Sequence, residues 1–402
     1  MTTKVISTIR KMFFAPAGQA ARGDVLVYIF LHGGADGLNM VVPVGDRFYP
    51  YLRPTIKILE PARRDVKSGI DLNGYFALHP ALAPLKPFYQ DASLAVVHAV
   101  GLPAPTHSHF DAQANLERGS LDSKAITTGW LGRYLASKKT DNPSPLRAMS
   151  FAPILPAALR GPEPVVALQS LDSFSMTGRL QDQNEYLNYL QSLYQTPGDN
   201  WGMHQAADEI QQALSTLGKL KKLDYASSNY IAYPQSRFGQ SLVDTIQLIH
   251  ADIGLEVVCL EMGGWDTHAG EGSINGTMNR LLLELGQGLA AFATDLGDRM
   301  KNVLVMTVSE FGRRARENGS HGTDHGHGNA MFLLGGGVAG GKVYGTWPTL
   351  APDKLSGAGD LAVTTDYRDV FAEVLQNRLG NPSLVSVFPD YTPKPVGVFK
   401  PL

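Results

Sequence analysis

The chain has 402 residues, 44% of them hydrophobic and 18% charged, and this composition is typical of a globular enzyme. Its formal net charge of −2 argues against a nucleic-acid partner or a general affinity for anionic membranes. The only cysteine, Cys259, excludes an intramolecular disulfide and disfavours a thiolate metal cluster. We expect no membrane span, because no apolar run approaches the roughly 20 residues that a bilayer requires.

Residues 1–22 form an N-terminal segment that is similar to a degenerate export signal. Arg10 and Lys11 precede Met12, Phe13 and Phe14, but a pair of adjacent arginines and a full apolar core are missing. Taken as written, the chain is predicted to be cytoplasmic. The alternative is a periplasmic protein whose true N-terminus carries a signal. Residues 23–402 are expected to form a single α/β domain.

Apolar runs and helical patterns alternate along this domain. Runs at 24–31, 94–100, 255–262, 302–308 and 330–334 are typical of strands buried on both faces. Between 255 and 308 an amphipathic pattern, with Thr277 as its expected N-cap, predicts a βαβ unit with parallel strands. Residues 140–250 are expected to be mostly helical, either as a cap over the site or as helices on one face of the sheet. A final helix is predicted over 366–378.

The segment 105–113 carries a serine between two histidines. It follows a predicted strand and opens a predicted helix, so Ser108 lies where unpaired N–H groups and the helix dipole stabilise an alkoxide. This position favours Ser108 as a nucleophile with His109 as a catalytic neighbour. The alternative is that Thr106 or Ser108 only caps the helix and that the histidines are surface residues.

Two further segments offer metal ligands. Asp266 and His268 are two residues apart at the end of a predicted strand, where they share one face and suit Zn, Mn or Fe. Asp324 and His325 belong to a histidine-rich segment set among glycines, which permit close approach to an ion. The alternatives are a turn aspartate with a hydrogen-bonded histidine, and a flexible loop with incidental histidines.

A pair of arginines follows the run at 302–308. Arg313, beside a metal site, is expected to clamp a substrate oxyanion and is therefore a candidate catalytic residue. For Arg314 a surface salt bridge is an equal alternative.

Five segments together resemble a bacterial family known only as domain of unknown function fifteen-oh-one, grouped with the alkaline phosphatase and sulfatase superfamily. These segments are 32–43, 108–113, 263–268, 309–313 and 322–326. The resemblance runs from about residue 23 to 350. It implies a three-layer αβα sandwich with a mostly parallel central sheet of the alkaline-phosphatase type.

The resemblance also implies a site with two adjacent metal ions. Asp36 and Glu310 would bind one ion next to the nucleophile, Ser108. The ligands implied for the second ion are Asp266, His268 and His325. The chain departs from this plan in two places, because Phe311 replaces a usual histidine ligand and because one residue rather than three separates Asp266 from His268.

These departures leave the number of ions open, and His107, His109 or His327 could supply a missing ligand. The segment around Ser108 also lacks the C/S-x-P-x-R setting of a formylglycine sulfatase. The sequence therefore predicts a hydrolase of small anionic esters, phosphate rather than sulfate, that uses one or two divalent ions of Zn, Mn or Fe. The alternatives are a redox-active copper or iron site and a non-catalytic binding protein on a decayed hydrolase fold.

Overall fold

A computed structural model of the chain describes residues 24–62, 65, 67–104, 106–121, 126–138, 142, 144–172, 212–218, 231–381 and 383–400. The expected export signal at 1–22 lies outside the described residues, as do residues 173–211 and 219–230 of the expected cap. Within the described part no helix combines the length and the apolar composition needed to cross a membrane.

The described strands form one large sheet and one small sheet. The large sheet has nine strands in the order β11-β5-β10-β9-β1-β8-β6-β7, with β12 also paired to β5, and the small sheet has the order β2-β4-β3. The strands are β1 (Val25–Leu31), β2 (Val41–Val42), β3 (Ile70–Asp71), β4 (Ala77–Leu78), β5 (Leu94–Gly101), β6 (Ala148–Phe151), β7 (Val166–Leu168), β8 (Val257–Met262), β9 (Val303–Val308), β10 (Asn329–Gly335), β11 (Val343–Tyr344) and β12 (Thr365–Asp366).

The centre of the large sheet consists of parallel strands buried on both faces. β1 lies between β8 and β9 and is parallel to both, with Leu31 opposite Met262 and Phe30 opposite Val308. Among the described strands of the large sheet, only β10 runs antiparallel, against β5 and β9. The five predicted strands are all present, and the mostly parallel sheet is confirmed. The two strands of the predicted βαβ unit, β8 and β9, are parallel but not adjacent, because β1 separates them.

The described helices flank the sheet. The α-helices are α2 (Gly37–Met40), α3 (Tyr49–Leu52), α4 (Lys86–Gln90), α5 (His109–Arg118), α6 (Trp130–Ser137), α9 (Arg237–His250), α10 (Thr277–Leu296), α11 (Tyr367–Glu373) and α12 (Leu384–Val387), with a further short helix over 212–218. Shorter helical turns are η1 (Pro80–Leu85), η2 (Ala157–Leu159), η3 (Gly297–Asn302) and the π-helical η4 (Val374–Arg378).

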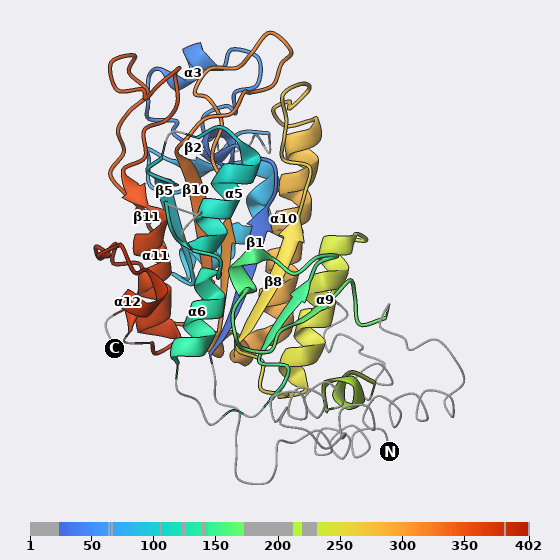
Figure 1. Cartoon of the computed structure of the whole chain (residues 1–402). Coiled ribbons are helices and arrows are strands. Elements are labelled where there is room, and N and C mark those ends of the chain that lie inside the picture. The colour runs from blue at the N-terminus through green and yellow to red at the C-terminus, as the bar shows by residue number, and fades with distance from the viewer. Residues whose placement is uncertain are drawn as a thin grey trace, which may run out of the picture.

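Two hydrophobic cores, one on each face of the sheet, produce three layers. Successive side chains of a strand point to opposite faces, so Val27 and Ile29 of β1 pack with α9 and α10, whereas Leu26 and Tyr28 pack with α6 and α11. Figure 1 shows α9 and α10 on one side of the sheet, and α5, α6 and α11 on the other. The predicted three-layer αβα sandwich is therefore confirmed.

Three expectations about individual elements need correction. The described residues between 144 and 172 include strands β6 and β7, which extend the large sheet beside β8, where we expected helix. Gly276 rather than Thr277 precedes the first turn of α10, and its φ of 103° suits glycine. The final helix ends as the π-helical turn η4 instead of continuing as an α-helix.

Candidate metal centre

The loops that follow β1, β8 and β9 lie side by side at one edge of the large sheet. The strand pairing continues past the strand ends, because the His32 N–H donates to the Met262 carbonyl at 2.9 Å and the Trp265 N–H donates to the His32 carbonyl at 3.2 Å. The start of the antiparallel strand β10 lies at this same edge. In parallel α/β sheets ligands bind beyond the carboxyl ends of the strands, so the candidate residues are gathered at the expected edge.

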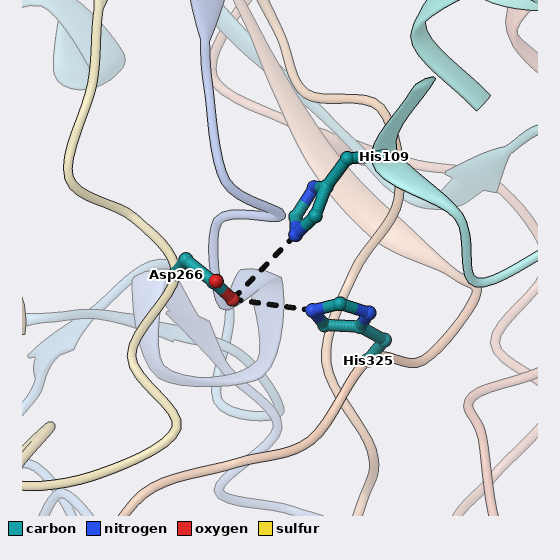
Figure 2. A group of neighbouring side chains, drawn as sticks. All are labelled: His109, Asp266 and His325. Carbon is teal, nitrogen blue, oxygen red and sulfur yellow. Dashed lines mark hydrogen bonds and ion pairs between the residues drawn. The ribbon is translucent and has the colours of Figure 1, made fainter. Parts of the chain in front are cut away.

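Three imidazoles and one carboxylate meet at this edge. The Nε2 atoms of His268, His325 and His109 lie 3.1, 3.2 and 3.6 Å from Oδ1 of Asp266. Figure 2 shows His109 and His325 directed at the Asp266 carboxylate from separate segments. His109, Asp266 and His325 each offer a ligand atom, and these atoms lie within 4.8 Å of one another. The structure therefore brings together residues that are more than 150 positions apart in the sequence.

Each of these imidazoles has an oxygen partner on its Nδ1. His325 Nδ1 lies 2.8 Å from the His107 carbonyl, and His109 Nδ1 lies 2.7 Å from Glu310 Oε1. His268 Nδ1 lies 3.1 Å from Asp324 Oδ1. A carbonyl or a carboxylate can only accept, so the Nδ1 atoms carry the hydrogens. In the neutral rings the Nε2 lone pairs then point toward Asp266.

This pattern fits a bound cation. Metal-ligating histidines commonly donate their other ring N–H to a carboxylate or a backbone carbonyl. His109 Nε2 is buried and has no hydrogen-bond partner among the described residues. The Nε2 atoms of His268 and His325 are 2.9 Å apart, a distance at which two lone pairs repel unless a proton or a cation lies between them. Metal–nitrogen distances of about 2.0–2.1 Å place tetrahedral ligand atoms about 3.3 Å apart, close to the observed separations.

The pKa shifts of Asp266 and His325 favour the protonation states that bind a metal ion. Partial burial raises the pKa of Asp266, but the hydrogen bond and the positive charge of Arg313 outweigh burial and bring this pKa to about 2. Burial lowers the pKa of His325 and so favours its neutral ring. A carboxylate and neutral imidazoles are the protonation states that bind a metal ion.

Glu310 lies behind His109 rather than in the cluster. It is 2% exposed, and its Oε1 accepts from the Gly33 N–H at 2.9 Å as well as facing His109 Nδ1. Its Oε2 accepts from the Ser309 hydroxyl at 2.9 Å. The resemblance implied a direct metal ligand, whereas the geometry makes Glu310 the residue that orients the His109 ring. Phe311, which replaces the usual histidine, packs against the rings of His109 and His325 with centroids 4.8 Å away.

Asp36 does not join the cluster either. Both of its carboxylate oxygens bind the guanidinium of Arg53, and both side chains are fully buried. Burial raises the pKa of Asp36, but the charge of Arg53 prevails and holds the pKa below its usual value. Because Arg53 occupies both oxygens of Asp36, the two-ion arrangement that the resemblance implied is not formed by the described residues.

Arg313 is buried and its donors are engaged by the protein. It donates to Asp266 Oδ1 at 2.6 Å and to four backbone carbonyls, those of Gly33, Gly34, Trp265 and Thr323. A guanidinium has five N–H donors in a fixed fork, so little remains for a substrate. Arg313 therefore holds Asp266 and three loops in place, whereas the sequence led us to expect that it binds a substrate oxyanion.

Ser108 directly precedes His109 in the sequence. It is the N-cap residue of α5, and its Oγ accepts from the Asp111 N–H at 3.4 Å. His107 Nε2 binds the buried Asp360 at 2.8 Å, and His327 Nε2 binds the Ala104 carbonyl at 2.8 Å. These two histidines are therefore engaged outside the cluster, and His109 is the one of the three that joins it.

The sequence did not indicate three buried charged residues that bind candidate residues or the loops of the cluster, namely Arg53, Asp360 and Glu271. Their partners are Asp36, His107, Thr267 and Thr323, which lie in loops with no regular pattern. Their charge within stretches that become buried was the only available signal, because a charged side chain is rarely buried without a partner. Such a signal needs the burial pattern, which the sequence alone does not provide here.

The fold and this cluster define an α/β protein with a candidate histidine–aspartate metal centre. The family model described as "Protein of unknown function (DUF1501)" matches residues 96–382, more than half of the chain, so the chain belongs to this family. The expected family is thus confirmed, and the matched range includes the whole cluster but not Asp36. No curated protein matches the chain. Among solved structures it is similar to the lipoteichoic acid synthase LtaP from Listeria monocytogenes, with 10% identity, a TM-score of 0.34, and coverage of 91% of this chain and 81% of that one.

Proposed function

We propose that this chain is a metal-dependent hydrolase of phosphate esters, and that it shares the chemistry of the alkaline phosphatase and sulfatase superfamily. The observation that carries the proposal is the convergence of His109, His268 and His325 on Asp266 with every Nδ1 facing an oxygen acceptor. His109 and His325 with Asp266 would hold the ion, and His268 would complete the site. This set fits Zn, Mn or Fe.

The position of Ser108 supports a role as the nucleophile. When bound, the metal would supply positive charge that stabilises the charge developing on the phosphate group. Ser108 Oγ forms a bond to phosphorus while the ester P–O bond breaks, and the proton of Ser108 leaves with the alcohol product. Water then cleaves the seryl phosphate and releases inorganic phosphate and the free serine. The α5 N-terminus, which begins at His109, would favour the anionic substrate.

The substrate class follows from the same residues. Arg313 is engaged by carbonyls, so the ion and the start of α5 are the positive features that face an anionic ester. The segment after Ser108 differs from the formylglycine setting, which favours phosphate over sulfate esters. We therefore propose a small phosphate ester as the substrate.

Hydrolysis of an aryl phosphate by the zinc-loaded protein tests the proposal. Ser108→Ala and Asp266→Ala should each lower kcat/KM at least 100-fold. Ser236→Ala is the matched control, because Ser236 caps α9 in the same way through the Gly239 N–H at 3.0 Å. If Ser108→Ala and Ser236→Ala both leave turnover unchanged, Ser108 is only a helix cap. If the wild type binds zinc without turnover, a non-catalytic binding protein is the better account.

A redox-active iron site is the second candidate, and one observation favours it. His109, His325 and Asp266 constitute two histidines and one carboxylate, the ligand set of mononuclear non-haem iron enzymes. Anaerobic loading with ferrous iron, followed by addition of oxygen, tests it. Oxygen consumption that depends on His325, together with the absence of ester hydrolysis, would replace the hydrolase proposal.

A further inference from the structure

Two loops carry three of the four residues of the cluster. The loop 263–271 follows β8 and contains Asp266 and His268, and the loop 318–327 contains His325. Backbone hydrogen bonds join them, from the Gly270 N–H to Ser320, from the Glu271 N–H to His321 and from the Thr323 N–H to Thr267, at 3.0–3.1 Å. The geometry of the cluster therefore depends on the distance between these two loops.

Glu271 joins the same two loops through its side chain. Its Oε2 accepts from the Thr267 hydroxyl at 3.1 Å and from the Thr323 hydroxyl at 2.6 Å. Thr267 lies between Asp266 and His268, and Thr323 is two residues before His325. One carboxyl oxygen thus binds a neighbour of a cluster residue in each loop. Thr267, Thr323 and Glu271 are all buried, which removes water as a substitute partner.

The remaining contacts of Glu271 anchor it to the core of the molecule. Its Oε1 accepts from Asn39 Nδ2 at 3.4 Å, and its carboxyl is hydrogen-bonded to that of Asp36. Burial and the charge of Asp36 raise the pKa of Glu271 well above its usual range, so this carboxyl is neutral. Asp36 is in turn fixed by Arg53. The chain of contacts runs from the loop after β1 through Glu271 to both loops of the cluster.

We propose that Glu271 is a positioning residue of the candidate metal centre, which sets the distance between the Asp266–His268 loop and the His325 loop through Thr267 and Thr323. This inference rests on the proposed metal centre. Among the described contacts Glu271 binds no residue of the cluster itself, and it acts through the hydroxyls of Thr267 and Thr323, which lie within two residues of the cluster. Residues that orient metal ligands typically contribute 10–100-fold to metal affinity.

Zinc affinity of the full chain, measured by competition with a chromophoric chelator, tests this role. Glu271→Leu should weaken zinc binding about tenfold, whereas Glu271→Gln should stay within about threefold of the wild type, because a neutral amide can donate to Asp36 and accept from both hydroxyls. Thr323→Val removes only one hydroxyl and should weaken binding by an intermediate factor. It also carries the test if Glu271→Leu does not fold.

Thr245→Val is the matched control, because Thr245 is also fully buried but donates to Ser241 inside α9. The Tm of the metal-free variants separates positioning from stability. Weaker zinc binding by Thr323→Val than by Thr245→Val at equal Tm supports the inference. Equal zinc affinity in Glu271→Leu, Thr323→Val and the wild type would overturn it while leaving the metal centre intact. A wild type that binds no zinc would overturn the proposed function and the inference together.

Discussion

At the scale of single residues, the acceptor opposite each Nδ1 determines the tautomer of the imidazole and thereby leaves its Nε2 free to bind an ion. Glu310 is the most deeply buried side chain among these acceptors, and it also receives the Gly33 N–H and the Ser309 hydroxyl. The His109 ring is therefore held by a carboxylate that is itself fixed by two other donors. Preorganisation of this kind lowers the cost of binding an ion.

The substitution Glu310→Gln is expected to weaken zinc binding by about 10–100-fold, because the neutral amide lacks the negative charge with which the carboxylate orients His109 and raises the basicity of its ring. A chelator competition assay measures the change. Glu163→Gln is the control, since Glu163 is partly exposed and contacts only Arg147, at 3.5 Å, among the pairs described. An affinity equal to that of the control variant would show that Glu310 does not orient a ligand.

Arg313→Met should lower the free energy of unfolding by about 3 kcal/mol or more, because four backbone carbonyls and Asp266 lose their donor. Urea unfolding measures this change. The neighbouring Arg314 is the matched control: its side chain is 37% exposed and lies 3.9 Å from Asp360, so Arg314→Met should cost about 0.5 kcal/mol or less. A stable Arg313→Met protein with only a raised KM would instead support the role expected from the sequence, in which Arg313 binds a substrate oxyanion.

The sequence predicted residue types better than residue roles. Asp266, His268 and His325 were recognisable because they lie in short polar segments after apolar runs, and the structure brings them together. The roles expected for Asp36 and Glu310 were not supported, because they depended on partners that the segments do not contain. Arg53 is 17 positions from Asp36, and His109 is 201 positions from Glu310. Only the folded chain shows which charges these buried groups meet.

At the scale of elements, the two loops of the cluster pack too closely for a side chain at one position. A Cβ on Gly322 would lie 2.4 Å from the Thr267 carbonyl oxygen and 2.5 Å from the backbone of His268, whereas a Cβ on Gly319 would meet nothing within 4 Å. The two loops thus leave no room for a side chain at Gly322, next to Thr323, whereas Gly319 has free space around it.

Gly322→Ala should cost about 1–3 kcal/mol of stability and weaken zinc binding, because the loops must separate to admit the methyl group. Gly319→Ala, in the same loop, should change neither quantity appreciably. Thermal unfolding and chelator competition provide both readouts. Identical behaviour of the two alanine variants would mean that loop spacing does not control the cluster.

The segment before β6 is tied to β8 by a buried ion pair. Glu256 is 3% exposed, and it binds Arg147 Nε at 3.0 Å and Asn142 Nδ2 at 2.9 Å. Burial raises the pKa of Glu256, but these partners prevail and lower it from its ordinary 4.5. A lowered folded-state pKa contributes stability above the unfolded pKa, and this contribution is lost as the pH falls through the folded value.

Glu256→Gln is therefore expected to be about 1–2 kcal/mol less stable than the wild type at pH 7. The difference should shrink as the pH falls below 4.5 and through the lowered pKa of Glu256, where the wild-type carboxyl also becomes neutral. Urea midpoints at pH 7 and pH 3.5 measure both values. A difference that stays constant over this range would contradict the assigned role of the ion pair.

Element prediction succeeded where apolar runs were long. β1, β5, β8, β9 and β10 each have six or more residues and coincide with the predicted strands. β6 and β7 have four and three residues, lie in a proline-rich stretch and escaped detection. Strand order was also inaccessible, because β1 is inserted between β8 and β9 by pairing over more than 230 positions.

At the scale of the whole molecule, the three-layer sandwich explains why distant segments share one site. The central parallel strands end at one edge, and the antiparallel β10 begins there, so loops from β1, β8, β9 and β10 converge with the start of α5 (Figure 1). The two cores hold the strands from both faces and leave this edge to polar loops. The fold places the candidate metal centre, and the loops determine its ligands.

The central claim is that His109, His325 and Asp266 hold one metal ion. Elemental analysis of zinc-loaded, dialysed protein tests it most directly, with Asp266→Ala and His325→Ala beside the exposed control Asp298→Ala. We expect about one zinc ion per chain in the wild type and in the control, and a loss of most of this zinc in the other two variants. Zinc content that is the same in all four proteins, or a wild type without zinc, would contradict the claim.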